Sequence, residues 1–402
     1  VYGGAGVHVE YLARELASRV DLTVHCWGAD RDDPAVRAHR PWDALAGSEP
    51  HLAALQAISI DLLMAAGVEA AEVVHSHTWY AQFGGHLAKL TYGIPHVATV
   101  HSLEPLRPWK AEQLGGGYAL SSFCERVGLE GADAVIAVSA GSKRDILACY
   151  PAIDPERVQV VYNGIDTAEY TPDPGTDVLN RVGVDPDRPS VVFIGRITRQ
   201  KGVPHLLRAA LDFDPRAQLV LCAGAPDTPE IGAAVAAGVK RLQESRDGIF
   251  WIDQMLPKAD VIQLLSHATV FACPSIYEPL GIVNLEAMAC EAAVVASATG
   301  GIVEVVDDGA TGFLVPLEQA PGEIDPIDPE GFARAFAERI NTLIADPGLA
   351  AKMGKAGRQR VMRHFAWPAI AEETQTIYRR LTDRRGTPSP AAPAHAPATP
   401  LL

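Results

Sequence analysis

The sequence Pro-Ser-Ile-Tyr-Glu-Pro-Leu-Gly-Ile-Val-Asn-Leu-Glu-Ala-Met-Ala at residues 274–289 joins the end of a strand pattern to the start of a helix pattern. Residues 268–273 are a short apolar run typical of a buried parallel strand, and a helical apolar period begins at Val283. Glu278 is therefore predicted in the turn at the carboxyl edge of a sheet, where open α/β folds bind ligands. Glu286 would lie inside the helix, so the two carboxylates would meet different hydroxyl groups of one polyhydroxylated ligand. The alternative is a surface acid beside a salt-bridged acid.

A second strand-to-helix turn carries two cations. The strand-like residues 190–194 run into Gly-Arg-Ile-Thr-Arg-Gln-Lys-Gly at 195–202, and residues 203–211 have a helical pattern. Arg196 offers a rigid fork for phosphate oxygens, Lys201 offers a mobile point charge, and the following helix start adds partial positive charge. The turn is thus a candidate diphosphate cradle, with two solvated surface cations as the alternative. A glycine pair at 300–301 precedes a further helix pattern and would let backbone amides approach a ligand.

These motifs, in this order, resemble a known family. The C-terminal half is similar to the nucleotide-sugar half of retaining GT-B glycosyltransferases of the glycogen synthase type, called family 4. The motifs that carry the resemblance are VYGGAGVHV (1–9), VHSHTWY (74–80), HSLEPLRPWK (101–110), YNGID (162–166), GRITRQKG (195–202), PSIYEPLGIVNLEAMA (274–289) and GGIVEVVDDGATGFLV (300–315). Together they resemble the actinobacterial glycogen synthase and α-maltose-1-phosphate synthase subgroup.

The chain alternates strand-like and helix-like segments in the manner of βαβ units, which predicts an α/β fold. By resemblance this is the GT-B architecture, in which two doubly wound Rossmann-like domains face each other across a cleft. A segment rich in Pro and Gly predicts an interdomain linker. The predicted divisions are an N-terminal acceptor-side domain at 1–163, the linker at 164–189, a C-terminal nucleotide-sugar-binding domain at 190–366, a helix at 367–385 that by resemblance crosses back to the N-terminal domain, and a Pro/Ala tail at 386–402 that we expect to be disordered.

The chain opens inside the glycine motif, at Val1. Members of the resembled family carry a β-strand ahead of this motif, so we expect the first strand of the N-terminal domain to be missing. Loss of a central strand would leave its neighbours with unpaired backbone groups, and we therefore expect the chain as given to fold poorly.

The resemblance also implies roles for individual residues. Catalytic roles fall to Arg196, Lys201, Glu278 and His101. The donor-binding residues that it implies are Gly3, Gly4, Arg196, Lys201, Glu278, Leu280, Gly281 and Glu286. Arg107 and Lys110 follow His101 as two cations in a loop, and we hypothesise that they bind the phosphate of glucose 1-phosphate; solvated surface charges are the alternative. His77 and Tyr80 are further acceptor-side candidates.

The implied activity is that of a retaining hexosyltransferase without a cofactor. It would move glucose from ADP-glucose to glucose 1-phosphate, forming α-maltose 1-phosphate, and/or to an α-1,4-glucan in glycogen biosynthesis. Another donor or acceptor within family 4 stays open, as does a non-catalytic nucleotide-sugar-binding fragment. A glycosidase also uses paired carboxylates, but hydrolysis of a neutral glycan does not require Arg196 and Lys201.

The composition of the chain limits the kinds of partner, redox state and metal site that we expect. The formal charge of −15 argues against a nucleic acid or an anionic membrane surface, since both are bound through basic patches. Six scattered cysteines without a C-x-x-C pair indicate reduced thiols of a cytoplasmic protein. The chain could also form a homodimer. His75, His77 and His101 are conceivable zinc ligands, but no metal site is expected, because His75 and His77 place two rings on one strand face without a third ligand nearby in sequence. The D-x-D at residues 30–33 is interpreted as a solvated polar loop.

Overall fold

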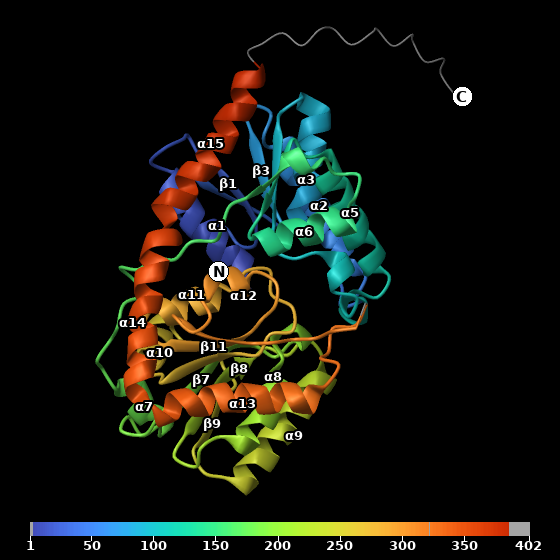
Figure 1. The fold of residues 1–402 in the computed structure, drawn as a ribbon. Helices are drawn as coiled ribbons and strands as arrows, with labels where there is room; N and C mark the ends of the chain where they lie inside the picture. Colours follow the sequence, from blue (N-terminus) through green and yellow to red (C-terminus); the bar gives the residue numbers. More distant parts are fainter. Residues whose placement is uncertain (1–2, 321, 386–402) are drawn as a thin grey trace, which may run out of the picture.

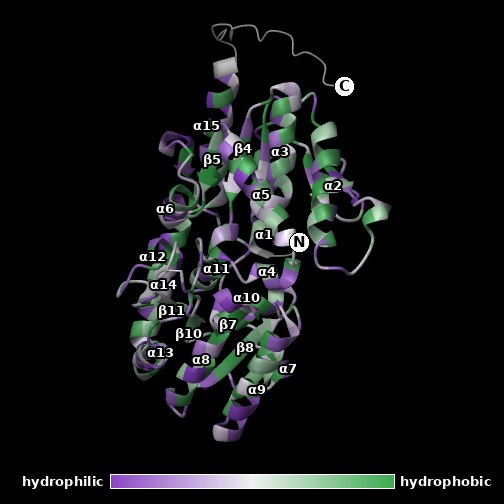
Figure 2. Cartoon of the chain, turned by 90° about the vertical axis from the view of Figure 1, so that its right-hand side faces the viewer, coloured by the Kyte–Doolittle hydropathy of each residue, from purple (hydrophilic) through white to green (hydrophobic). Residues whose placement is uncertain are grey.

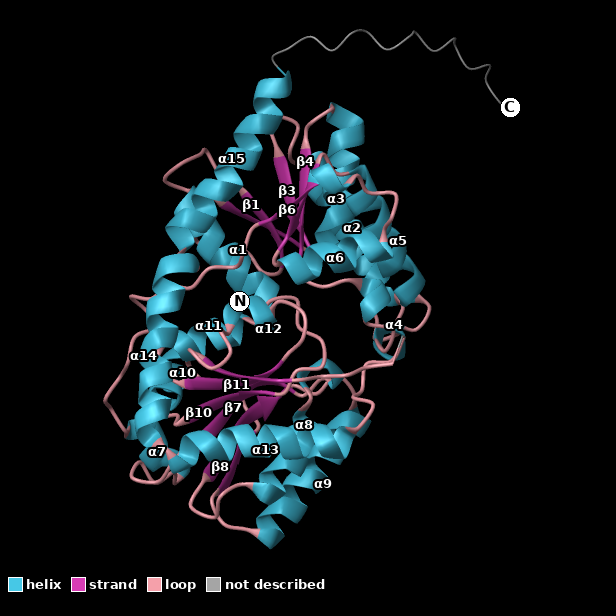
Figure 3. Cartoon of the chain, viewed as in Figure 1, coloured by secondary structure: helices cyan, strands magenta, loops and turns pink. Residues whose placement is uncertain are grey.

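The computed structural model describes residues 3–320 and 322–385. Two groups of parallel strands, each wrapped by helices, lie one above the other, with the blue to green N-terminal elements above the yellow to orange C-terminal elements (Figure 1). Figure 3 shows the strands, in magenta, in two groups that are each surrounded by helices, in cyan. The α/β fold class predicted from the alternating pattern is therefore confirmed.

The N-terminal part contains a four-stranded parallel sheet in the order β3-β4-β5-β6 and a separate parallel pair, β1-β2. Its strands are β1 (Val24–Trp27), β2 (Val36–His39), β3 (Val74–His77), β4 (His96–Val100), β5 (Ala134–Ala137) and β6 (Val158–Val160). Its helices are α1 (Gly3–Leu16), α2 (Leu52–Ala66), α3 (Trp79–Tyr92), α4 (Lys110–Leu114), α5 (Gly117–Gly131) and α6 (Ala140–Cys149). β2 was not predicted, because Val-Arg-Ala-His is too short and too polar to show a strand pattern. Residues 30–33, between β1 and β2, form an exposed loop as expected.

The C-terminal part contains a six-stranded parallel sheet in the order β12-β11-β10-β7-β8-β9. Its strands are β7 (Ser190–Arg196), β8 (Gln218–Gly224), β9 (Ile249–Ile252), β10 (Val270–Cys273), β11 (Ala293–Ser297) and β12 (Gly312–Val315). Its helices are α7 (Asp177–Val182), α8 (Val203–Ala209), α9 (Pro229–Ser245), α10 (Lys258–Ser266), α11 (Ile282–Ala289), α12 (Ile302–Val305), α13 (Pro329–Ala345) and α14 (Pro347–His364). Figure 2 colours the strands β7 and β8 as hydrophobic, which fits a sheet covered on both faces.

The strand order places a switch point between β7 and β10. The chain runs from β7 outward through β8 to β9, and then returns to the other side of β7 with β10. Open α/β sheets bind ligands at such a reversal, in a crevice at the carboxyl edge of the sheet. Arg196 ends β7, and the loops that carry Lys201 and Glu278 follow β7 and β10, so all three lie at this edge of the sheet.

The segment 164–189, predicted as a linker from its Pro and Gly content, also takes part in the C-terminal core. It contains α7, and the side chains of Tyr170, Val178 and Leu179 are buried among the strands and helices of the six-stranded sheet. The segment packs into the core despite its Pro and Gly content, because burying each large apolar side chain gains about 1.5–3 kcal/mol.

The last helix, α15 (Trp367–Arg385), packs along α1. Trp367 and Ile370 share a buried cluster with Tyr11 and Leu12, and the rings of Trp367 and Tyr11 stack with their centroids 5.7 Å apart. The domain limits given above stay predictions. Among the described residues, no helix combines the length and the apolar character needed to cross a membrane.

Candidate active site

The crevice at the switch point brings a lysine and a glutamate into an ion pair. Lys201 Nζ lies 2.6 Å from Glu278 Oε2, and the Ser275 hydroxyl donates to the same oxygen over 3.3 Å. Burial by itself would lower the pKa of Lys201, but the charge of Glu278 prevails and raises it above the usual value. Lys201 is thus a fixed cation at the position where a diphosphate was predicted.

Backbone contacts between the two loops set this geometry. The Ile276 amide donates to the Gln200 carbonyl over 2.8 Å, and Gly202 adopts a left-handed conformation with φ +64°. A Cβ at Gly202 would lie 2.0 Å from the Pro274 carbonyl oxygen. Only glycine therefore allows the lysine loop to approach the glutamate loop so closely.

Arg196, at the end of β7, is held by an acid that sequence reasoning missed. Its guanidinium donates to Asp227 Oδ1 over 2.5 Å, and the Asp227 side chain is only 3% exposed. Asp227 follows β8, in the loop before α9, so its position at the same sheet edge is typical of a parallel fold. The sequence does contain a signal for Asp227, because this acid lies in the loop pattern that follows the strand ending at Gly224.

Glu286 lies on α11, deeper in the crevice. Burial raises its pKa to about 7, against the lowering effects of a hydrogen bond from Tyr170 and of the charges of Lys258 and Lys201. The Tyr170 hydroxyl donates to Glu286 Oε1 over 3.0 Å. Tyr170 is not among the predicted site residues, because it lies in the predicted linker.

The start of α11 and the glycine pair frame Glu278. Leu280 is buried, and Gly281 has φ +93° just before the helix. The Gly301 amide donates to the Glu278 carbonyl over 3.0 Å. On the N-terminal side, Gly4 lies in α1 with Ile282 3.6 Å from where its Cβ would be, and Gly3 begins the same helix. Gly4 thus faces the start of α11.

Three histidines from the N-terminal elements lie together. His77 Nδ1 is 3.1 Å from His101 Nε2, and the His8 ring lies 4.8 Å from the His101 ring, between centroids. Burial lowers the pKa of His77 and His101 well below the usual value and that of His8 to about 4, so all are neutral near pH 7.

His8 is a third imidazole beside His77 and His101, although it is distant from both along the chain. Helix α1 supplies it from the start of the chain, and nitrogen atoms of His8, His77 and His101 lie within 4.8 Å of one another. Among the described residues, this is the group that could hold a metal ion; neutral imidazoles equally suit hydrogen bonds to sugar hydroxyls.

The acceptor-side candidates occupy different surroundings. Arg107 NH2 lies 2.5 Å from Glu104 Oε1, and Lys110 Nζ donates to Gln113 Oε1 over 2.5 Å. Tyr80 is 42% exposed at the start of α3, with its ring against Trp79. Arg107 and Lys110 are therefore held in place by partners, whereas Tyr80 is partly exposed to solvent.

Comparison with known proteins identifies relatives of the whole described chain. Residues 2–169 match the family model described as Glycosyltransferase Family 4, and residues 177–360 match Glycosyl transferases group 1. The chain is 57% identical to the alpha-maltose-1-phosphate synthase of Mycolicibacterium smegmatis, over 95% of this chain and 96% of that protein. It is 30% identical to the D-inositol 3-phosphate glycosyltransferase of Kineococcus radiotolerans, over 97% and 93%. Its fold matches a sucrose-phosphate synthase structure from Thermosynechococcus elongatus with a TM-score of 0.78 and 26% identity, over 95% and 94% of the chains.

Proposed function

The chain belongs to glycosyltransferase family 4 and has the GT-B fold, and from this premise we propose that it transfers glucose from ADP-glucose to glucose 1-phosphate, forming α-maltose 1-phosphate. One observation carries the proposal: the 57% identity, over nearly the whole length of both chains, to a relative whose name states this product. The pairing of cations and acids at the switch point supports the donor half of the reaction.

The leaving group determines what the site must do. The bond between the anomeric carbon and the diphosphate oxygen breaks with its electron pair going to the phosphate, while the acceptor oxygen forms the new glycosidic bond on the same face. Negative charge therefore grows on the diphosphate, and fixed cations stabilise it most in the transition state. Arg196 and Lys201 supply this charge, and the departing phosphate oxygen takes the acceptor proton.

The acids and His101 hold the sugars. Glu278 accepts hydrogen bonds from donor-sugar hydroxyls near the reacting carbon, with the amides of Leu280 and Gly281 beside it. Glu286 accepts from the ribose hydroxyls, and His101 contacts a glucose hydroxyl as a neutral imidazole. Gly3 and Gly4 let the backbone of α1 approach the diphosphate or the acceptor. Each role follows the family pattern and fits the placement of these residues around the crevice.

The phosphate of the acceptor is the basis of a first prediction. Lys110 is connected to Arg196 through Gln113 and Asp227, and the charges of Arg107 and Arg196 both contribute to lowering the pKa of Lys110. The double change Arg107→Ala with Lys110→Ala should raise the KM for glucose 1-phosphate about tenfold or more, since charge-assisted hydrogen bonds are each worth about 1.5–3 kcal/mol. The KM for ADP-glucose should change less than threefold or so, and an unchanged KM for glucose 1-phosphate in steady-state assays would reject the assignment.

The pKa of Glu286 gives a second prediction. Because burial raises this pKa to about 7, the carboxylate is mostly charged near pH 8 and mostly protonated near pH 6. Only the charged form is a strong acceptor for ribose hydroxyls, so the Kd for ADP-glucose should rise about fivefold as the pH falls from about 8 to about 6.

The control for this titration is Glu286→Gln, which should bind ADP-glucose more weakly and lose the pH dependence. His8, His77 and His101 do not interfere, because burial lowers their pKa values out of this window. A Kd that is flat in the natural chain, or a pH dependence retained by Glu286→Gln, would contradict the proposed ribose contact.

The proposed function is tested by assaying products. ADP-glucose, UDP-glucose and GDP-glucose are each supplied with glucose 1-phosphate or with glycogen, and products are separated by mass spectrometry. We expect maltose 1-phosphate with ADP-glucose as the preferred donor. Elongation of glycogen without maltose 1-phosphate would overturn the acceptor, a different preferred base would overturn the donor, and free glucose as the main product would indicate hydrolysis.

A further inference from the structure

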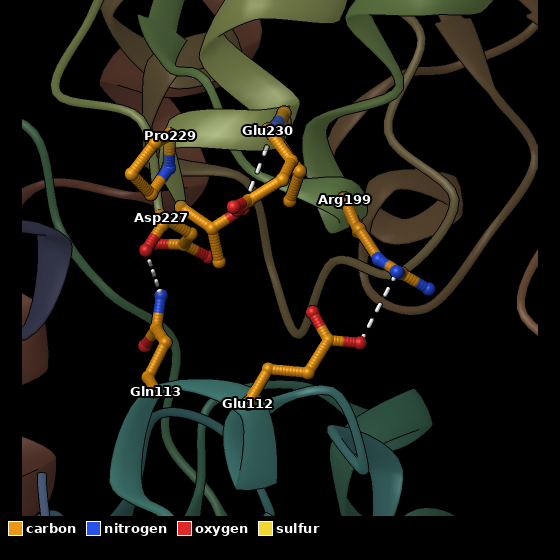
Figure 4. Close-up of a pocket in the computed structure, with 8 residues that line it drawn as sticks. Glu112, Gln113, Arg199, Asp227, Pro229 and Glu230 are labelled. Carbon is orange, nitrogen blue, oxygen red and sulfur yellow. Dashed lines mark hydrogen bonds and ion pairs between the residues drawn. The ribbon is translucent and has the colours of Figure 1, made fainter.

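A short helix of the N-terminal part touches the donor-side loops across the cleft. The Gln113 amide nitrogen, on α4, donates to the backbone carbonyl of Asp227 over 3.0 Å (Figure 4). Asp227 lies between β8 and α9 in the C-terminal part. The contact therefore forms only when the two parts of the molecule are close together.

The same amide also holds the acceptor-side lysine. Lys110 and Gln113 are one helical turn apart on α4, and Lys110 Nζ donates to Gln113 Oε1. The oxygen of the amide thus accepts from Lys110 while its nitrogen donates to Asp227. An amide is the side chain of this length that can do both, because a carboxylate lacks the donor and a leucine lacks both groups.

The carboxylate of Asp227 completes the connection. It holds the Arg196 guanidinium at 2.5 Å and is almost fully buried. Three cations, Arg107, Lys110 and Arg196, lie around two acids, Asp227 and Glu104. Burial lowers the pKa of Lys110, and the charges of Arg107 and Arg196 lower it further, against the opposing effects of Asp227 and Glu104. Closing the cleft therefore brings like charges together, and bound phosphate groups would offset that repulsion.

We propose that Gln113 is a positioning residue that links Lys110 to the Asp227 loop in the closed cleft, so that the acceptor phosphate and the donor diphosphate bind cooperatively. The inference rests on the proposed roles of Lys110 and Arg196 as phosphate-binding cations. Because one amide contacts both Lys110 and the Asp227 loop, a phosphate that fixes Lys110 also fixes the loop that holds Arg196, and each phosphate thereby raises the affinity for the other.

A neighbouring contact provides the matched control. Glu112, next to Gln113, pairs with Arg199 over 3.2 Å across the same pocket of about 600 Å³, and both side chains are about half exposed. This pair also spans the two parts of the molecule, as Figure 4 shows. It has no link to Lys110, so Glu112→Gln removes an interdomain contact without touching the connection through Gln113.

The experiment compares Gln113→Leu with Glu112→Gln in the full chain. ADP is titrated by calorimetry without addition, with inorganic phosphate, and with glucose 1-phosphate. In the natural chain and in Glu112→Gln, we expect either phosphate compound to tighten ADP binding about fivefold or more. In Gln113→Leu this factor should fall close to one, while the KM for glucose 1-phosphate rises about tenfold and the Kd for ADP alone stays within about twofold.

Three results would overturn the inference: no coupling in the natural chain, full coupling in Gln113→Leu, or equal loss in both variants. The proposed function fails separately. If inorganic phosphate couples to ADP through Gln113 but no maltose 1-phosphate is formed, the inference stands and the acceptor assignment is wrong. If maltose 1-phosphate is formed while Gln113→Leu keeps the coupling, only the inference is lost.

Discussion

Replacement of Lys201 by alanine is expected to lower kcat for glucosyl transfer about 10²–10³-fold, which corresponds to about 3–4 kcal/mol of lost transition-state stabilisation. The side chain is 19% exposed and held at 2.6 Å from Glu278, so its charge is fixed before the substrate arrives. A fixed cation in a site shielded from water stabilises the growing charge of the diphosphate without reorganising during the reaction. Steady-state rates at saturating ADP-glucose and glucose 1-phosphate provide the measurement.

Arg199→Ala is the matched control for this change. Arg199 lies in the same turn, but it is 47% exposed and its partner Glu112 is 48% exposed. An exposed ion pair contributes about 0–1 kcal/mol, so we expect a rate within about threefold of the natural chain. Because Lys201→Ala leaves Glu278 without its cationic partner, a thermal melt of each variant separates loss of rate from loss of fold. A rate for folded Lys201→Ala within about fivefold of the natural chain would remove Lys201 from the mechanism.

Gly300→Ala should have the second large effect, through the backbone of the site. Gly300 has φ +51°, and a Cβ there would lie 1.9 Å from the carbonyl oxygen of Glu278. A backbone oxygen cannot rotate away as a side chain can, so the loop that carries Glu278 must move. We expect kcat to fall about 10²-fold or more, since small displacements of a positioned group can cost that much, and the unfolding temperature to fall as well.

Gly309→Ala is the control that separates the strain of a left-handed backbone from the steric overlap with Glu278. Gly309 also has a left-handed conformation, with φ +76°, but nothing lies within 4 Å of where its Cβ would be. It should lose only about 1–2 kcal/mol of stability from the backbone conformation and keep its activity. If Gly300→Ala and Gly309→Ala have the same unfolding temperature and the same kcat, the close approach between the glycine pair and Glu278 is not required for activity.

The loops that we assign to the donor could be located from local sequence patterns. Strand runs followed by Gly, Pro and a helical period placed Arg196, Lys201 and Glu278 in loops at the carboxyl edge of a sheet, and the structure brings the last two into contact. Parallel sheets make such predictions dependable, because the ends of all strands meet at one edge. The order of the strands, and hence the switch point between β7 and β10, was not readable, because strand order depends on packing between distant segments.

By itself, the sequence determined the α/β class, the family and the residues of the strand-to-helix turns, since each follows from spacing over a few neighbouring residues. The tertiary structure decided which side chains those residues meet: Asp227 beside Arg196, Tyr170 beside Glu286, His8 beside His101, and Gln113 between the two parts of the molecule. These pairs are far apart along the chain, and only the packing of both sheets and their helices sets the distances between them. A local pattern carries no information about such distances, because many arrangements of the same elements satisfy it equally well.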